Sequence, residues 1–192
     1  DEIFKSFLNY RRENLDVKSI LSTIIAKKDL TEKQAYAFME NLADGTLDER
    51  ITAAVLAALS VKEPAVSEIV GFAKGLLKYK KPLPVSFSNN AEIVGTGGDG
   101  KGSFNISSMS ALVASSLGLI VTKHGNRAVS SKSGAADFFE NLGINIMADP
   151  AKTCDLIQNT NFGFLMAPVY HSAMRHAAPV RKVLGIKTVM NI

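Results

Sequence analysis

Residues 92–108 read EIVGTGGDGKGSFNISS, and they decide the fold of the second half of the chain. Ile93 and Val94 predict a short strand, five glycines follow it, and residues 110–117 are expected to form a helix. Glycine lets backbone N–H groups approach an anion closely, and a helix N-terminus adds positive potential. The stretch therefore predicts a phosphate-binding loop between a strand and a helix.

Two generic glycine motifs nearly fit this loop. Gly95, Gly97 and Gly100 have the spacing of a dinucleotide-binding loop, but no carboxylate ends the next predicted strand, where one should hold a ribose. Gly95 with Gly100 and Lys101 resembles a nucleoside triphosphate loop, but its next residue should be Ser or Thr and is Gly102. Both motifs are disfavoured, and a glycine-rich turn without a ligand remains as an alternative.

A second polar loop follows at residues 123–134, which read KHGNRAVSSKSG. It lies between a predicted strand at 119–122 and a predicted helix at 135–142. Two loops that both follow parallel strands project from the same edge of a sheet, so together they could hold a ligand with more than one phosphate. A solvated surface loop is the alternative.

The remaining pattern alternates strand with helix. Strands are expected at 144–147 and 162–166, and Asp149 followed by Pro150 predicts a helix start between them. This alternation is typical of parallel βαβ units. Residues 187–192 resemble the start of a further strand, so we expect a C-terminal part of the sheet to be absent.

The first 80 residues or so predict only helices. Two capping-box pairs, Thr31 with Gln34 and Thr46 with Glu49, predict helix starts, and Gly45 predicts a helix end. Two more helices are expected before residue 80. Apolar residues recur at helical spacing in the first helix, at Val17, Ile20, Leu21, Ile24 and Ile25.

These patterns predict an α/β protein in which a small N-terminal helical domain, residues 17–81, precedes a partial, mainly parallel βαβ sheet domain, residues 82–192. Residues 1–16 are expected to be a linker or the end of an upstream domain. Prolines at 82 and 84 and the polar run at 86–90 mark the boundary between the two domains.

Composition narrows the class of protein. Of 192 residues, 46% are hydrophobic and 21% are charged, as in globular proteins, and no apolar run approaches the length of about 20 residues that a membrane span needs. The net charge of +4 is mild and forms no basic stripe, so neither nucleic acid nor a membrane is an expected partner. The single cysteine, Cys154, indicates a reducing, cytoplasmic location and is expected to be a packing residue.

Several motifs, in order along residues 17–192, carry a family resemblance. They are GTGGD at 95–99, FNIS at 104–107, KHGNR at 123–127, SKSG at 131–134 and APVRKVLGIKT at 178–188. With these motifs the chain resembles the anthranilate phosphoribosyltransferases of tryptophan biosynthesis. The resemblance implies a fold like that of nucleoside phosphorylases and phosphoribosyltransferases, a homodimer joined through the helical domain, and Mg²⁺ as cofactor.

The implied reaction transfers phosphoribose from phosphoribosyl pyrophosphate to anthranilate, giving N-(5-phosphoribosyl)anthranilate and pyrophosphate. By resemblance, Gly95, Asn126 and Arg181 would contact anthranilate, and Ser107 would help to hold Mg²⁺. A planar guanidinium such as that of Arg181 can pair with a carboxylate through two hydrogen bonds. The residues implied to line the phosphoribosyl pyrophosphate site are Gly95, Gly98, Asp99, Ser103, Asn105, Ile106, Ser107, Ser108, Lys123, His124, Gly125, Asn126, Arg127, Ala128, Val129, Ser130 and Ser131.

The expected chemistry is displacement at the anomeric carbon by an amine that needs no strong base. Catalysis would come from positioning and from stabilising the departing pyrophosphate with backbone N–H groups, Lys123 and Mg²⁺. No catalytic residue is assigned firmly, although His124 could accept a proton. His171 and His176 are expected near the approach of the amine.

Some positions depart from the family pattern. Ser172 stands where the family usually has proline, and Ala135 stands where it often has serine. The acidic pair that holds magnesium in the family would follow residue 192, so the fragment alone is expected to be inactive. Residues 1–16 exceed the usual start, which indicates a possible fusion behind a glutamine amidotransferase. A pyrimidine nucleoside phosphorylase-like enzyme and a non-catalytic phosphate-binding paralogue remain as alternatives.

Overall fold

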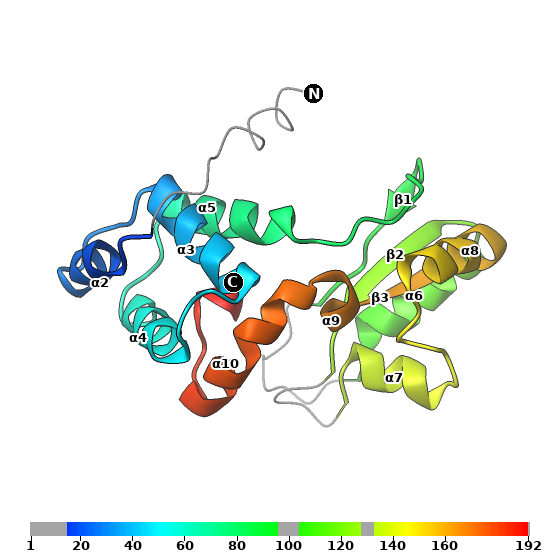
Figure 1. The fold of residues 1–192 in the computed structure, drawn as a ribbon. Coiled ribbons are helices and arrows are strands. Elements are labelled where there is room, and N and C mark those ends of the chain that lie inside the picture. Colours follow the sequence, from blue (N-terminus) through cyan, green and yellow to red (C-terminus); the bar gives the residue numbers. More distant parts are fainter. Residues whose placement is uncertain (1–14, 96–103, 128–132, 192) are drawn as a thin grey trace. The chain divides into compact units, whose positions relative to one another are not determined.

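The computed structural model describes residues 15–95, 104–127 and 133–191 (Figure 1). Within these ranges the chain forms two compact units, one made of residues 15–80 with 172–191 and the other of residues 81–171. The first unit is helical and the second combines helices with a parallel sheet, which confirms the predicted fold class. The unit boundary places residues 172–191 with the helices, whereas the boundaries expected from the sequence assign them to the sheet domain.

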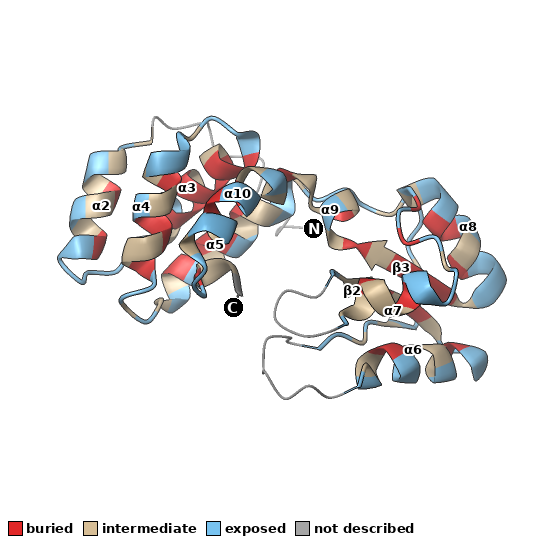
Figure 2. Ribbon diagram, turned by 90° about the horizontal axis from the view of Figure 1, so that it is seen from below, coloured by how far each residue is buried: buried red, intermediate tan, exposed pale blue. Residues whose placement is uncertain are grey.

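The helical unit contains two parts of the chain. Its helices pack around a shared apolar core, whose buried positions Figure 2 shows in red. The elements are α2 (Val17–Ile25), α3 (Glu32–Asp44), α4 (Glu49–Leu59), α5 (Val66–Lys78), α10 (Ala178–Leu184) and the 3₁₀ turns η1 (Ser172–His176) and η2 (Val189–Asn191).

Two of the three predicted signals at helix ends in this unit are confirmed. Thr31 and Gln34 form a complete capping box at α3, which Gly45 ends with a left-handed φ of 76°. The capping box expected at Thr46 is wrong, because Asp48 caps α4 with its own carboxylate, which accepts the Arg50 N–H at 2.8 Å. Aspartate next to the helix satisfies the same free N–H groups, so it displaces a threonine two residues upstream.

The apolar face of α2 serves the core of this unit. Ile20 and Ile24 are buried against α4 and its neighbours, while Ile25 is exposed. The second part of the chain joins the same core through Ala177 and Val180. These contacts explain why residues 172–191 belong with the helices.

The α/β unit contains three parallel strands in the order β1-β2-β3 (Figure 1). Their register pairs Asn90 with Ile120 and Val121 with Phe162. The elements are β1 (Asn90–Ala91), α6 (Ile106–Ser116), β2 (Ile120–Gly125), α7 (Ala135–Asn141), α8 (Pro150–Thr160), β3 (Phe162–Met166) and α9 (Ala167–Tyr170). The predicted starts of α7 and α8 and the bounds of β3 are confirmed.

Helices cover both faces of this sheet. Phe164 of β3 packs with Phe139 of α7 and Ala111 of α6 in one apolar cluster. Gly163, which precedes Phe164 in β3, faces the other side of the sheet, where an added Cβ would lie 2.5 Å from Cγ1 of Ile157 in α8. Cys154 of α8 is buried there too, which confirms its packing role.

Three predicted strands differ from the structure. The strand expected at Ile93 and Val94 lies at Asn90–Ala91 instead, because the carbonyl of Ile93 accepts a hydrogen bond from the Lys123 side chain. Residues 144–147 form no strand; residues 146–147 form a turn, in which the Met147 N–H bonds to the side chain of Asn145. Residues 189–191 form a 3₁₀ turn, and Val189 and Met190 pack on the helical core rather than on the sheet.

Candidate functional site

The first glycine loop is described only at its two ends. Gly95 precedes it, and a Cβ added to Gly95 would lie 3.6 Å from Oγ of Ser107. The start of the loop therefore lies beside the first turn of α6. Residues 96–103 lie outside the described ranges, so the roles expected of Gly98, Asp99 and Ser103 stay predictions.

Helix α6 begins four residues earlier than the sequence predicts. The carbonyl of Asn105 accepts the N–H groups of Ser108 and Met109 at 3.1 and 3.0 Å, which draws residues 106–108 into the helix. Ser107 and Ser108 therefore lie in the first turn, where free N–H groups and the helix dipole favour an anion. Ser108 is fully buried, and its hydroxyl has no hydrogen-bond partner among the described residues, whereas the Ile106 side chain is exposed.

The end of β2 places a lysine inside the protein. Lys123 is 1% exposed, and its ammonium donates to the carbonyl oxygen of Ile93 at 2.7 Å. Burial lowers the pKa of Lys123, against the smaller opposing effect of the nearby carboxylate of Glu92. The side chain thus ties β2 to the segment that leads to Gly95.

His124 is half-buried beside a second histidine. Its ring meets that of His171 edge to face, with centroids 5.4 Å apart. Burial lowers the pKa of His124, and its buried Nε2 atom has no hydrogen-bond partner in the described part of the chain. The imidazole is therefore neutral near pH 7 and retains a nitrogen that can accept a proton. The structure brings His124 and His171 together, whereas His176 lies in the helical unit against Gly45.

Gly125 ends β2 where no side chain fits. An added Cβ would lie 2.9 Å from Cε2 of Phe164 and 3.0 Å from Cβ of Ala135. The methyl group of Ala135 packs against the glycine here. The position that departs from the family pattern therefore contributes to packing at the base of the second loop.

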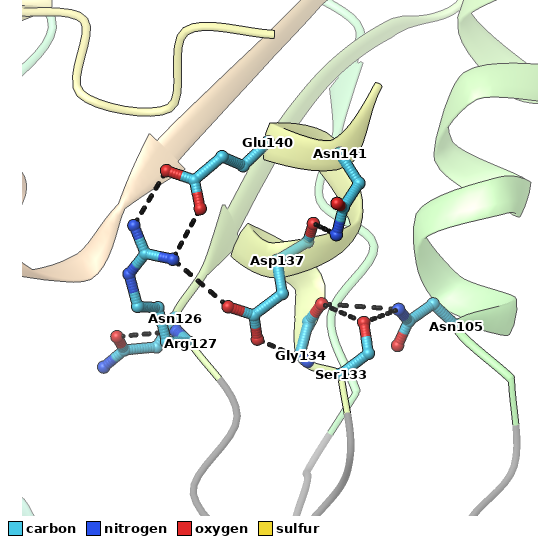
Figure 3. A network of polar contacts seen from close by, with 8 residues as sticks. All are labelled: Asn105, Asn126, Arg127, Ser133, Gly134, Asp137, Glu140 and Asn141. Atoms are coloured by element: carbon cyan, nitrogen blue, oxygen red, sulfur yellow. Dashed lines mark hydrogen bonds and ion pairs between the residues drawn. The ribbon is translucent and has the colours of Figure 1, made fainter. Parts of the chain in front are cut away.

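The two ends of the second loop are joined by polar contacts (Figure 3). Nη1 and Nη2 of Arg127 donate to the carboxylate of Glu140 at 2.6 and 2.9 Å, and Nη1 also donates to Asp137 at 3.2 Å. The amide of Asn105 donates to Ser133 Oγ and to the Gly134 carbonyl, both at 3.3 Å. Residues from both loops therefore meet at the start of α6 and α7.

The guanidinium of Arg127 pairs with two carboxylates of α7, which raise its pKa. The role that the resemblance implies for Arg127, lining a phosphate site, stays a prediction. The Asn126 side chain accepts the N–H of Arg127 at 2.8 Å, which fixes the turn after Gly125. The other loop residues with expected roles, Ala128, Val129, Ser130 and Ser131, lie outside the described ranges.

The three residues expected to contact anthranilate belong to different units. Gly95 and Asn126 belong to the α/β unit, and Arg181 lies in α10 of the helical unit. Burial lowers the pKa of the Arg181 guanidinium. Their convergence on one ligand stays a prediction.

Magnesium fits the described residues only in part. Ser107 offers a hydroxyl oxygen, a ligand type that Mg²⁺ accepts, and Mg²⁺ commonly completes its shell with water and substrate phosphates. Among residues 15–95, 104–127 and 133–191 there is no cluster of three or more His, Cys, Asp or Glu side chains that could hold a metal. Ser107 would therefore act as one ligand among others.

Sequence reasoning missed Asp137 and Glu140. Both acidic side chains lie on α7 and hold the second loop through Arg127. Asp137 carried a usable signal, because an acidic residue three positions after Gly134 fits the first turn of a helix.

The described helices include none that is long and apolar enough to span a membrane.

Comparison with known proteins assigns the family. The description "Glycosyl transferase family, helical bundle domain" matches residues 18–79, and "Glycosyl transferase family, a/b domain" matches residues 88–192. The chain therefore belongs to this glycosyl transferase family, whose two domains correspond to the helical and the α/β parts of the sequence.

Individual relatives narrow the likeness further. The chain is 43% identical over 92% of its length to anthranilate phosphoribosyltransferase of Shouchella clausii, and it covers 52% of that protein. It is similar to the crystal structure of anthranilate phosphoribosyltransferase from Thermus thermophilus (TM-score 0.82, 43% identity, 90% of this chain and 52% of that one). It is also similar to the Saccharomyces cerevisiae enzyme in complex with PRPP and Mg (TM-score 0.84, 28% identity, 95% and 55%).

The predicted resemblance to anthranilate phosphoribosyltransferases is thereby confirmed. The chain spans about half the length of the relatives that it matches.

Proposed function

We propose that the protein containing this chain transfers phosphoribose from phosphoribosyl pyrophosphate to anthranilate. The observation that carries the proposal is the meeting of both loops at the start of α6, where Asn105 binds Ser133 and Gly134. Free N–H groups at a helix start beside a glycine loop suit a ligand with several phosphates. The likeness to the yeast enzyme in complex with PRPP and Mg supports the same ligand here.

The proposed reaction breaks the bond between the anomeric carbon and pyrophosphate and forms a bond from that carbon to the amine nitrogen. The loops hold the pyrophosphate, which leaves with the electron pair of the broken bond, and the helix N-terminus stabilises its charge. Mg²⁺ would supply further charge stabilisation to the pyrophosphate, with Ser107 as one oxygen ligand. The amine loses its proton after attack, and the neutral His124 is a candidate acceptor.

Lys123 has a supporting part in this proposal. Because its ammonium binds the Ile93 carbonyl, it holds the segment leading to Gly95 against β2 and adds positive potential beneath the loops. Arg181 would pair with the carboxylate of anthranilate. A likeness to a Saccharomyces cerevisiae variant of the enzyme in complex with 4-fluoroanthranilate supports the choice of acceptor.

The first experiment titrates phosphoribosyl pyrophosphate with Mg²⁺ into the parent protein and into Asn105→Ala by calorimetry. We expect the parent to bind and the variant to bind at least about tenfold more weakly, because the amide that joins the two loops is lost. A parallel assay follows the consumption of anthranilate, with and without a chelator of Mg²⁺. Phosphorolysis of uridine without any transfer to anthranilate would overturn the proposal in favour of a nucleoside phosphorylase.

A further inference from the structure

One carboxylate holds both ends of the second loop. Oδ1 of Asp137 accepts from Nη1 of Arg127 at 3.2 Å, and Oδ2 accepts the backbone N–H of Gly134 at 2.8 Å (Figure 3). Arg127 precedes and Gly134 follows the central residues of the loop. Asp137 therefore fixes the separation of the two ends.

A second carboxylate secures the arginine. Glu140 lies one helical turn after Asp137, so both side chains lie on the same face of α7. Its two oxygens accept from both terminal nitrogens of Arg127, at 2.6 and 2.9 Å. Paired donors of this kind fix the direction of a guanidinium as well as its distance. The single positive charge of Arg127 also offsets one of the two carboxylate charges, which would otherwise repel an anionic ligand of the loop.

The same contacts reach the first loop. The Gly134 peptide donates its N–H to Asp137, and its carbonyl accepts from the side-chain amide of Asn105 at 3.3 Å. Asn105 is the residue immediately before α6. A displacement of Gly134 would therefore shift the start of the helix whose first turn carries Ser107 and Ser108.

We propose that Asp137 and Glu140 are positioning residues for phosphoribosyl pyrophosphate, acting through Arg127, Gly134 and Asn105. This inference rests on the proposed function and extends it to residues that need not touch the substrate. The two carboxylates hold the loop ends in the geometry that binds pyrophosphate before the ligand arrives. Their loss lowers affinity for that substrate and leaves the bond-making step unchanged.

Steady-state kinetics of the full-length protein test the inference. Asp137→Asn leaves a single side-chain oxygen, which cannot accept from both Arg127 and the Gly134 N–H as the carboxylate does. We therefore expect KM for phosphoribosyl pyrophosphate to rise about tenfold. Glu140→Gln weakens only the arginine side, and we expect a rise of about threefold. In both variants kcat and KM for anthranilate stay within about twofold of the parent, the ordinary spread of such comparisons.

Asp155→Asn is the matched control. Asp155 is an exposed carboxylate on α8 of the same unit, so this variant removes the same charge without touching the loops. We expect its kinetic constants to equal those of the parent. An unchanged KM for phosphoribosyl pyrophosphate in Asp137→Asn, or a fall in kcat alone, would overturn the inference. A lowered melting temperature of Asp137→Asn with unchanged KM would show that Asp137 only caps α7, and this result would also overturn the inference.

Hydrogen exchange separates this inference from the proposed function. The amide of Gly134 donates to Asp137, so we expect it to exchange faster in Asp137→Asn than in the parent and in Asp155→Asn. If the parent transfers no phosphoribose, the proposed function fails. Faster exchange at Gly134 would then still support the bridge between the loop ends, and equal exchange would refute it.

Discussion

The ammonium of Lys123 donates a hydrogen bond to the carbonyl oxygen of Ile93 at 2.7 Å, although the lysine side chain lies inside the protein. Removing a cation from water is costly, and a single carbonyl dipole offsets only part of that cost. Burial accordingly lowers the pKa of Lys123 from its usual value of 10.5. The contact fixes the start of the glycine loop at the expense of a buried charge.

This contact predicts a pH dependence of stability. Between the lowered folded-state pKa of Lys123 and the usual 10.5, the unfolded chain binds more protons than the folded chain. The parent therefore gains stability as pH rises through that window, and Lys123→Met lacks the gain. Urea unfolding of both proteins at about pH 8 and about pH 10 measures this effect. The unfolding free energy of the parent relative to that of Lys123→Met should be larger at the higher pH. Parallel pH curves for the two proteins would contradict it.

Gly45 and His176 make a second testable contact. A Cβ added to Gly45 would lie 2.5 Å from Cε1 of His176, and φ at Gly45 is 76°. We expect Gly45→Ala to lower the free energy of unfolding by about 2 kcal/mol or more, from backbone strain and overpacking together. Gly143→Ala is the control, since Gly143 has φ of 79° and open space around it. The double variant Gly45→Ala with His176→Ala should regain the part of the unfolding free energy that overpacking removes. Equal losses of unfolding free energy in Gly45→Ala and Gly143→Ala would exclude an effect of the His176 ring.

Replacing Glu68, which lies in the helical unit, is expected to lower the free energy of unfolding strongly. Glu68 is fully buried and accepts the N–H groups of Leu30 at 2.9 Å and Ala65 at 2.8 Å, with the ammonium of Lys62 at 2.7 Å. We expect Glu68→Ala to cost about 3 kcal/mol, because it leaves two N–H groups without their acceptor and the Lys62 ammonium with Asp29 as its remaining partner. Glu63→Ala, at an exposed neighbouring position, should cost less than about 0.5 kcal/mol. Chemical denaturation measures both, and a similar small loss for Glu68→Ala would show that water replaces the carboxylate.

Arg181 tests the assignment of the acceptor site. Arg181→Lys keeps the charge but loses the planar pair of donors, so we expect KM for anthranilate to rise about tenfold. KM for phosphoribosyl pyrophosphate should stay the same. Lys182→Ala, at an exposed position of α10, is the control and should change neither constant. An equal rise in both KM values for Arg181→Lys would indicate a general structural role.

The sequence was informative where local chemistry decides the structure. Thr31 with Gln34, Gly45 and Asp149 with Pro150 mark helix ends because their side chains or backbone satisfy free peptide groups nearby. The alternation of strand and helix correctly predicted a parallel sheet.

Tertiary contacts decided the remainder. Ile93 looks like a strand residue, but the distant Lys123 side chain takes its carbonyl. Ile146 is apolar enough for a strand yet enters the core from a turn, because burial does not require a ladder. The ion pairs of Arg127 were not predicted, since no sequence rule connects it with carboxylates that follow it by 10 and 13 residues.

The chain passes between its two units twice, after Lys80 and after His171. Ala177 and Val180, which complete the helical core, therefore follow the whole α/β unit in the order of synthesis. A chain growing from its N-terminus makes helices α2 to α5 first, but their shared core lacks its last residues until those later ones leave the ribosome. The unit whose translation begins first thus completes its core only after residues 81–171 of the α/β unit have been made, and part of its apolar surface stays uncovered until then.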